Sequence, residues 1–347
     1  MKKSVLQCLY ADSEIIKQGD FKMKIGLLGC GAYGLALSSI MHDNNCDITM
    51  WTRNEEEANE LRTTRVNKKK LPDYTIPEDI KITSNIEECI TNKDLIVIAI
   101  PAAGIDNLAQ MMAPYISRKD HILIATKGIE QGTGLFIHEI ILKHLKTRNV
   151  AAISGPSFAV DIITKMPVGL AVAGKRRETV RRAKEALDNK YIKLRTSSDL
   201  IGIEACGAIK NVVAIAAGMI DGLGANDSTT AMFITEAIHD MMNILQAFHA
   251  KRKTVTTFAG LGDLLLTCTS VKSRNFSFGR LVGTNVSQEE IKEYLANTTV
   301  EGYYTLESIY KLLKDKKVSI PIIDLIYDIV VEGKNPEELL TFLVEKD

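Results

Sequence analysis

A lysine stands in the middle of an apolar helical stretch, where a charged side chain is out of place. Lys210 lies in the run Glu204-Ala-Cys-Gly-Ala-Ile-Lys-Asn-Val212, and its neighbours on the same helical face are mostly small. A long cation on such a face either pairs with an anion or has a lowered pKa, and both suit a proton donor that works near neutral pH. The structural alternative is that the Lys210 side chain extends its ammonium to the surface.

Further polar residues follow strands or tight turns. Lys127 comes just after an apolar run that ends at Ala125, and the carboxyl ends of parallel strands face the ligand crevice, so it can meet an anionic ligand. Asp263 follows a glycine-containing turn, where it can pair with a lysine. The run Ser273-Arg-Asn275 offers hydroxyl, guanidinium and amide donors that suit a phosphate. Each feature also has an ordinary structural explanation when it is taken alone.

Three glycines near the start of the chain fit a phosphate-binding pattern. Gly29-Cys-Gly31-Ala-Tyr-Gly34 matches G-x-G-x-x-G between an apolar run and a helical segment. The first glycine permits a tight turn, the second lets the backbone approach a pyrophosphate, and the third allows the helix to pack closely on the strand. Free N–H groups at the helix N-terminus then face the phosphates. In this setting the pattern indicates a dinucleotide-binding site, whereas the pattern alone is also found in structural turns.

The end of the second expected strand bears on which dinucleotide is bound. NAD-binding sites usually carry an acidic residue there, about 20 residues after the loop, which binds the ribose hydroxyls. This strand ends in Trp51-Thr-Arg53 without a carboxylate. A guanidinium at that point can hold a 2′-phosphate with two hydrogen bonds. The sequence therefore favours NADPH over NADH as the cofactor, and the alternative is that Arg53 is a solvated surface residue.

Short apolar runs alternate with helical segments through the first half of the chain. We expect strands at residues 24–29, 47–51, 94–100, 121–125 and 149–153, and helices at 32–41 and 102–113. Two further runs, 168–173 and 191–195, are expected to extend the same sheet. Because the strands are apolar on both faces, this pattern predicts a parallel sheet that is covered by helices on both sides.

The pattern changes after about Ser197, where apolar residues recur at three- and four-residue spacing. Helices are expected at 200–220, 228–250 and 305–313. We therefore expect an α/β protein with a Rossmann-like dinucleotide-binding domain at 23–197 and a mainly α-helical substrate-binding and catalytic domain at 198–347. Residues 1–22 are interpreted as an N-terminal extension and not as a signal peptide, because their apolar run is short, contains Gln7 and is followed at once by Asp12 and Glu14.

Composition and charge exclude several classes of protein. The 43 basic and 43 acidic residues give a net charge of +0, which does not favour a nucleic-acid partner, and the basic stretch 175–184 is expected to form a solvated helix face. Six cysteines without a CxxC pair indicate reduced thiols in a cytoplasmic protein, and six histidines without a ligand motif indicate no metal site. The most apolar stretch, 205–220, is interpreted as too short and too polar for an integral membrane segment.

Taken together, these segments resemble the NAD(P)-dependent glycerol-3-phosphate dehydrogenases, especially the soluble bacterial type. The resemblance runs in the family's order over most of residues 24–310 and leaves out the extension. Besides the glycine loop, the matching segments are Ala125-Thr-Lys-Gly-Ile-Glu130, Gly155-Pro-Ser-Phe-Ala159, Ala208-Ile-Lys-Asn-Val212, Gly260-Leu-Gly-Asp-Leu264, Ser273-Arg-Asn275 and Val300-Glu-Gly302. It implies reversible NAD(P)H-dependent reduction of dihydroxyacetone phosphate to sn-glycerol 3-phosphate, a supply of precursor to glycerophospholipid synthesis, and a homodimer.

The resemblance also implies roles for individual residues. Lys210 matches the catalytic lysine, and Lys127 and Asp263 match its active-site partners. The residues implied to bind the substrate are these three together with Gly155, Ser157, Ser273, Arg274 and Asn275. The residues implied to bind the cofactor are Gly29, Gly31, Ala32, Tyr33, Gly34, Arg53, Lys127, Ala159, Arg274 and Glu301. The family often has serine where this chain has Ala32, so only a backbone N–H contact is expected there.

Other functions share parts of this pattern. A two-domain dehydrogenase that acts on a 3-hydroxyacid or a sugar nucleotide would also have a helical second domain. A sugar-nucleotide enzyme that oxidises twice would need a cysteine nucleophile in a motif that this chain lacks. A non-catalytic NADPH-binding regulatory protein would not need Lys127, Lys210 and Asp263 together. The matching segments contain no histidine, which argues against a histidine-dependent hydroxyacid dehydrogenase.

Overall fold

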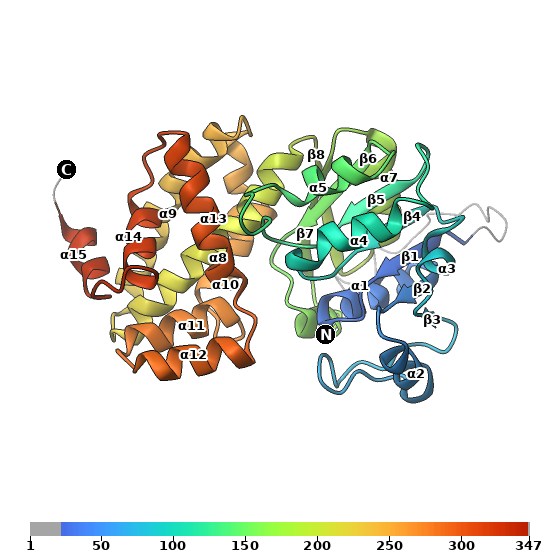
Figure 1. Cartoon of the computed structure of the whole chain (residues 1–347), viewed down its shortest axis with the longest axis horizontal. Helices are drawn as coiled ribbons and strands as arrows, with labels where there is room; N and C mark the ends of the chain where they lie inside the picture. Colours follow the sequence, from blue (N-terminus) through green and yellow to red (C-terminus); the bar gives the residue numbers. More distant parts are fainter. Residues whose placement is uncertain (1–21, 346–347) are drawn as a thin grey trace, which may run out of the picture.

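The computed structural model describes residues 22–345, and within these residues the chain forms a sheet domain and a helical domain that lie side by side (Figure 1). The expected extension therefore lies almost entirely outside the described residues. The sheet has eight strands in the order β3-β2-β1-β4-β5-β6-β7-β8. Their bounds are β1 (Lys24–Leu28), β2 (Asp47–Trp51), β3 (Lys81–Thr83), β4 (Leu95–Ile98), β5 (His121–Ile124), β6 (Asn149–Ser154), β7 (Val168–Gly174) and β8 (Ile192–Ser197).

Helices cover both faces of this sheet, as the apolar strands predicted. Neighbouring residues of one strand enter separate cores, because successive side chains point to opposite faces. Leu27 packs with α1 and α7 on one face, and Leu28 packs with α3, α4 and α5 on the other. The helices of this domain are α1 (Ala32–Asp43), α2 (Glu55–Thr64), α3 (Ile86–Ile90), α4 (Ile105–Met112), α5 (Ile137–His144), α6 (Ala159–Ile162) and α7 (Arg177–Leu187).

The expectation of a parallel sheet is wrong at one pair of strands. β7 runs antiparallel to β6, with Ser154 opposite Ala171, whereas β7 and β8 are parallel to each other. A parallel crossover usually contains a full helix. The connection from β6 to β7 contains only the four-residue α6, so the chain turns back along its neighbour instead. The short strand β3 and the helices α2 and α3 were also not expected from the sequence.

The register of the central strands brings their carboxyl ends to one edge of the sheet. Leu28, the last residue of β1, pairs with Trp51 at the end of β2 and with Ile98 at the end of β4. The strand order reverses between β1 and β4. Ligands of open α/β sheets bind in the crevice at such a reversal, outside the carboxyl ends of the strands. The glycine loop that follows β1 lies at this position.

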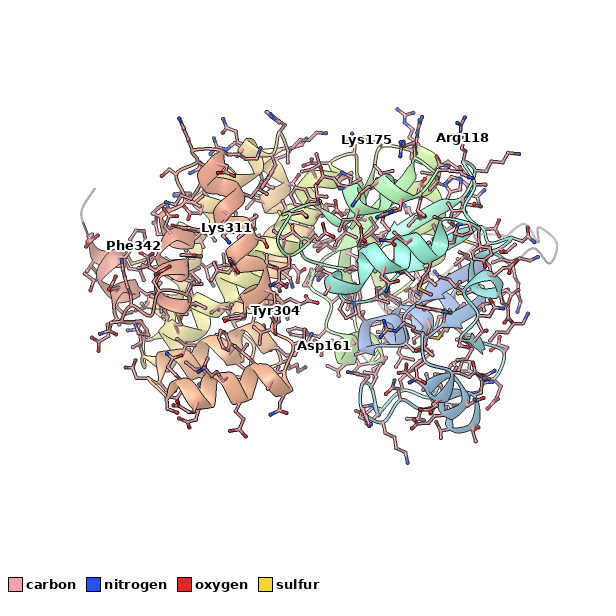
Figure 2. The ribbon with its side chains drawn as sticks, in the orientation of Figure 1. Arg118, Asp161, Lys175, Tyr304, Lys311 and Phe342 are labelled. Atoms are coloured by element: carbon pink, nitrogen blue, oxygen red, sulfur yellow. The ribbon has the colours of Figure 1, made fainter. Side chains whose placement is uncertain are left out.

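The basic stretch 175–184 forms an exposed helix face, as expected. It lies mostly on α7, where Arg181 forms ion pairs with Glu178 and Glu185 on the same helix. Arg182 reaches Asp94 with 3.2 Å between guanidinium nitrogen and carboxylate oxygen. Figure 2 shows the neighbouring Lys175 projecting away from the protein. Acidic partners therefore balance much of the positive charge of this helix.

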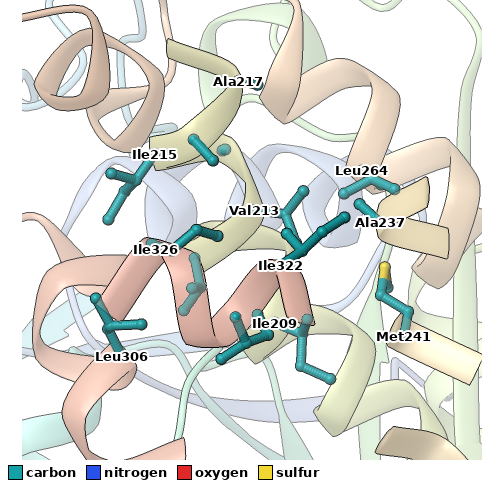
Figure 3. Packing of buried hydrophobic residues seen from close by; sticks show 14 of the residues in the cluster. Ile209, Val213, Ile215, Ala217, Ala237, Met241, Leu264, Leu306, Ile322 and Ile326 are labelled. Atoms are coloured by element: carbon teal, nitrogen blue, oxygen red, sulfur yellow. The ribbon is translucent and has the colours of Figure 1, made fainter. Parts of the chain in front are cut away.

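The helical domain is built around one central helix, α8 (Leu200–Gly222). Its residues 202–220 are all buried, and Figure 3 shows Val213 surrounded by apolar side chains from the neighbouring helices. The other helices of the domain are α9 (Asp227–Ala247), α10 (Asp263–Cys268), α11 (Arg274–Gly283), α12 (Gln288–Asn297), α13 (Glu301–Asp315), α14 (Pro321–Val330) and α15 (Glu338–Val344).

The length of α8 corrects one argument made from the sequence. Among residues 22–345 it is the one helix that is long and apolar enough to cross a membrane, so the expectation that this stretch is too short was wrong. In the folded chain, however, 94% of its most apolar window is buried inside the protein. Such burial is the ordinary environment of a core helix in a globular domain.

Helices α8 and α11 cross at very close range because glycines stand at their contact. A Cβ atom added at Gly279 would lie 1.8 Å from the backbone oxygen of Ile215, and one added at Gly218 would lie 2.0 Å from that of Phe276. Only a residue without a side chain fits there. This crossing fixes the distance between Lys210 on α8 and Arg274 at the start of α11.

We predict that Gly279→Ala lowers the free energy of unfolding by about 1–3 kcal/mol, because the added methyl forces the two helices apart. Alanine is otherwise the better helix former by about 1 kcal/mol, so local propensity would give the opposite sign. Urea unfolding measures the difference. The control is Arg280→Ala, which removes only an exposed ion pair with Asp221 and should cost less than about 1 kcal/mol. Equal stability of Gly279→Ala and wild type would contradict the packing argument.

Candidate active site

The three glycines of the loop have the geometry that a dinucleotide-binding turn requires. Gly29 has a φ of +122°, and a Cβ there would lie 2.5 Å from the carbonyl oxygen of Ala99. A Cβ at Gly34 would lie 2.1 Å from the carbonyl oxygen of Gly29, so the third glycine lets α1 pack on β1. A Cβ at Gly31 would meet no described atom within 4 Å, which leaves the loop open to a ligand. The loop therefore fits the pyrophosphate of a dinucleotide.

A single buried carboxylate holds two lysines at the junction of the domains. The Asp263 side chain accepts hydrogen bonds from Lys210 Nζ at 2.6 Å and from Lys127 Nζ at 2.7 Å, through different oxygens. Thr267 contacts Lys210 Nζ at 2.9 Å, and the Ser154 hydroxyl donates to Asp263 at 3.2 Å. Lys127 and Ser154 come from the sheet domain, while the other three residues come from the helical domain.

The two lysines have different electrostatic environments. The Lys210 side chain is 7% exposed and that of Lys127 is 17% exposed. Burial lowers the pKa of Lys210 to about 8; the positive charge of Lys127 adds to this effect, and Asp263 opposes it. Burial also disfavours the charge on Lys127, but the carboxylate of Asp263 outweighs that effect and raises the pKa of Lys127. Lys210 is therefore the cation that more readily gives up a proton near neutral pH.

Asp263 is placed by a short π-helical turn, Phe258–Gly262, that leads directly into α10. The turn is compact because Gly260 lies against the backbone of Val255, where a Cβ would be 2.1 Å from the carbonyl oxygen. Such π-turns are frequent at functional sites. Asp263 is the first residue of α10, and Thr267 lies one turn later on the same helix face, which brings both to the Lys210 ammonium.

Lys127 lies at the root of a loop that leaves β5 and packs on the helical domain. The backbone N–H of Gly132 donates to the Ser308 hydroxyl on α13 at 3.1 Å, and Gly134 lies against Leu312 on the same helix. At the end of the loop the Glu204 carboxylate of α8 accepts hydrogen bonds from the backbone and ring of His138. These contacts fix the loop from both ends and so orient Lys127.

A chain of polar contacts joins the glycine loop to this centre. The Tyr33 hydroxyl lies 3.2 Å from the Ser157 hydroxyl, which donates to the carbonyl oxygen of Gly155 at 3.0 Å. Lys127 Nζ donates to the same carbonyl at 3.4 Å and lies 5.8 Å from the centre of the Tyr33 ring. The residues implied to bind cofactor and those implied to bind substrate thus meet in one continuous site.

Ser273 and Asn275, which were expected to bind the substrate, each form structural contacts within the protein. The Ser273 hydroxyl accepts from the backbone N–H of Phe276 and caps α11. Asn275 donates to the side-chain oxygen of Asn211 at 3.0 Å and accepts from the backbone N–H of Gly302 at 2.8 Å. The amide thereby joins α8, α11 and α13, and one N–H of its Nδ2 group is left for a ligand.

The other expected site residues lie around this network. Arg274 is exposed, and among the described residues none forms an ion pair with it. Burial raises the pKa of Glu301, and the positive charges of Arg274, Lys210 and Lys127 oppose that shift. Ala32 begins α1, Ala159 begins α6, and Arg53 is exposed just after β2. The structure places these residues, and their binding roles stay predictions.

Comparison with known sequences identifies the family of proteins that carries this arrangement of domains. Residues 24–180 match the family described as NAD-dependent glycerol-3-phosphate dehydrogenase N-terminus, and residues 199–341 match the C-terminus of the same family. The chain belongs to the NAD-dependent glycerol-3-phosphate dehydrogenase family. The resemblance drawn from the short motifs is therefore confirmed, as is the Rossmann-like domain followed by helices.

Individual relatives are similar to this chain over nearly its whole length. A protein of Fusobacterium nucleatum named glycerol-3-phosphate dehydrogenase (NAD(P)+) is 37% identical over 328 residues, which cover 94% of this chain and 97% of the relative. A protein of the same name from Leptospira biflexa is 33% identical, with 94% and 98% covered. The crystal structure of glycerol-3-phosphate dehydrogenase from Coxiella burnetii has a TM-score of 0.87 at 29% identity and covers 94% of this chain and all of that one.

Three residues of the site were missed when the sequence was interpreted. Thr267 stands four residues after Asp263, so the helical spacing could have indicated it. Ser154 precedes the Gly155 turn directly and could have been included with it. Asn211 follows Lys210, but a neighbour in a helix points to another face, and nothing local in the sequence indicated its contact with Asn275.

We predict that Asp263→Asn lowers the free energy of unfolding by about 3–5 kcal/mol, because two buried ammonium groups lose their counter-ion. Urea unfolding at neutral pH measures this loss. The matched control is Ser154→Ala, which removes a single hydrogen bond to the same carboxylate and should cost about 1 kcal/mol. A change below about 1 kcal/mol for Asp263→Asn would show that the lysines do not depend on this carboxylate.

Proposed function

We propose that this chain is an NAD(P)-dependent oxidoreductase that reversibly reduces dihydroxyacetone phosphate to sn-glycerol 3-phosphate. The observation that supports this best is the buried Asp263 carboxylate shared by Lys127 and Lys210 beside an open glycine loop. A regulatory protein that only binds a nucleotide does not need two paired cations in its crevice. The family to which the chain belongs carries the same activity in its name.

The proposed reaction needs a hydride donor, a proton donor and side chains that bind the phosphate of the substrate. When bound, the reduced nicotinamide cofactor supplies the hydride to the carbonyl carbon. The Lys210 ammonium donates its proton to the developing alkoxide, and solvent then restores that proton. Lys127 adds a second positive charge beside the same oxygen and stabilises the charge that forms there. Asp263 keeps both lysines in place and stays ionised, because the two ammonium groups hold the pKa of its carboxyl low against the effect of burial.

The phosphate of the substrate is assigned to Arg274, with the hydroxyl of Ser273 and the remaining amide N–H of Asn275 beside it. A guanidinium can form two charge-assisted hydrogen bonds to a phosphate. Because the phosphate does not react, its binding energy positions the carbonyl against Lys210. Gly155 and Ser157 are assigned to the part of the substrate nearer the glycine loop.

The remaining features of the proposal concern the cofactor and the setting of the enzyme. The residues assigned to the dinucleotide are Gly29, Gly31, Ala32, Tyr33, Gly34, Lys127, Ala159, Arg274 and Glu301. Arg53 favours NADPH. We place the domain boundary at residues 197–198. The enzyme is proposed to be a cytoplasmic homodimer that uses no metal and supplies glycerophospholipid synthesis. The five cysteines among the described residues are free and buried, which fits a reducing compartment.

We predict that Lys210→Ala lowers kcat for dihydroxyacetone phosphate reduction by roughly 10²–10⁴-fold, the usual contribution of a general acid. In the wild-type enzyme, kcat for reduction should fall as the pH rises through about 8, because the acid form of Lys210 is lost there. Steady-state rates between pH 6 and 10 test both statements. Nucleotide affinity should change little in the variant, and a near-normal kcat would move the proton donor to another group.

Phosphate recognition gives a second prediction. Arg274→Ala should lower kcat/KM for dihydroxyacetone phosphate by roughly 10- to 150-fold, since a hydrogen bond to a charged group contributes about 1.5–3 kcal/mol. The low kcat/KM for unphosphorylated dihydroxyacetone should stay nearly unchanged. Arg280→Ala, an exposed arginine at the other end of α11, serves as the control. Wild-type enzyme that reduces both ketones equally well would rule out the phosphate assignment.

A further inference from the structure

A cavity of about 340 Å³ lies between the start of α2 and the segment 67–70. Its walls carry charges of both signs. Glu57 and Glu60 come from α2, and Lys68, Lys69 and Lys70 come from the facing segment. None of these residues was assigned a role from the sequence.

Two contacts place this cavity beside the glycine loop. The Asn67 amide, which lines the cavity, donates to the backbone oxygen of Cys30 at 3.2 Å. The Cys30 thiol in turn contacts the backbone oxygen of Trp51, the last residue of β2, at 3.7 Å. One wall residue of the cavity, Asn67, therefore touches the loop that fits a pyrophosphate, and that loop in turn contacts the end of β2. The adenosine half of a dinucleotide occupies this place in a Rossmann-like domain.

The side chain of Glu57 turns back from α2 toward the end of β2. Its carboxylate accepts a hydrogen bond from the hydroxyl of Thr52, which is buried. The Asn54 side chain accepts the backbone N–H of Glu57 at 3.1 Å and fixes the first turn of the helix.

We propose that Glu57 is a specificity-determining residue whose carboxylate accepts hydrogen bonds from the ribose hydroxyls of the adenosine half of the cofactor. The sequence indicated no acidic residue at the end of β2, because the strand itself ends in Trp51-Thr-Arg53. The structure supplies a carboxylate from the first turn of the next helix instead. A carboxylate at this point favours a free 2′-hydroxyl and repels a 2′-phosphate.

Glu57 and Arg53 thus act in opposite directions on the same group of the cofactor. Arg53 is exposed next to Thr52 and attracts a 2′-phosphate, while Glu57 holds the ribose of NADH. The presence of both residues accounts for an enzyme that accepts either nucleotide. This inference deepens the proposed function, because it rests on binding of a nicotinamide dinucleotide at the glycine loop.

Fluorescence titration of NADH and NADPH against the full-length protein tests the proposal without any turnover. Glu57→Gln should weaken NADH binding by about 10-fold or more and leave NADPH unchanged or tighter, so the Kd ratio shifts toward NADPH by at least about 10-fold. Arg53→Ala should shift the ratio in the opposite direction. Glu55→Gln, in the first turn of the same helix but not among the residues that line the cavity, is the matched control and should leave the ratio unchanged.

If Glu57→Gln does not fold, a second variant still tests the proposal. Thr52→Val removes the hydroxyl that holds the Glu57 carboxylate, and it should shift the Kd ratio in the same direction by a smaller factor. Equal changes for both nucleotides in these variants, with wild-type binding intact, would overturn the role of Glu57 and leave the proposed function standing. If the wild-type protein bound neither nucleotide, the proposed function would fail and this inference would fail with it.

Discussion

Two ammonium groups cannot be buried side by side without an anion, and in this protein the anion is one carboxylate. Removing one partner from a buried ion pair leaves a charge without compensation, at a cost of about 3–5 kcal/mol. Asp263 uses one oxygen for each lysine, so neither cation has to share an acceptor atom with the other. The end of β5, α8 and the π-helical turn before α10 together place the three side chains within hydrogen-bond distance.

The rest of the architecture brings groups from distant parts of the chain to that carboxylate. Parallel strands supply Lys127 and the Ser154 turn at one edge of the sheet, and a buried helix supplies Lys210. The amide of Asn275 joins three helices around the exposed guanidinium of Arg274. Hydrogen bonds within the protein hold Lys127, Lys210 and Asn275, so these side chains lose little conformational freedom when a ligand binds.

Local patterns in the sequence predicted the parts of the fold that depend on backbone conformation and on side-chain polarity over a few neighbouring residues. The glycine spacing indicated the loop after β1, and the apolar runs indicated the central strands. The charge of Lys210 within an apolar helix indicated either a buried ion pair or a lowered pKa, and the glycine turn before Asp263 indicated that this residue can pair with a lysine. Only the family resemblance linked Asp263 to Lys210 in particular. The antiparallel course of β7 depends on how the chain turns after Ser154, and a short apolar strand has the same composition in either direction. The contact of Glu57 with the end of β2 could not be predicted from the sequence either. Glu57 follows β2 by several residues, and its side chain meets Thr52 only because α2 folds back toward the strand.

The ion pair between Lys127 and Asp263 crosses the boundary between the domains, and this has a consequence for how the protein unfolds. If the sheet domain opened alone, Ser154 and Lys127 would leave the carboxylate, and the interdomain surface of α8 would be exposed to water. If the helical domain opened alone, Lys127 would lose its counter-ion. Each domain therefore raises the free energy of local opening in the other. The two domains are therefore coupled into a more cooperative unfolding unit than their covalent connection alone would give.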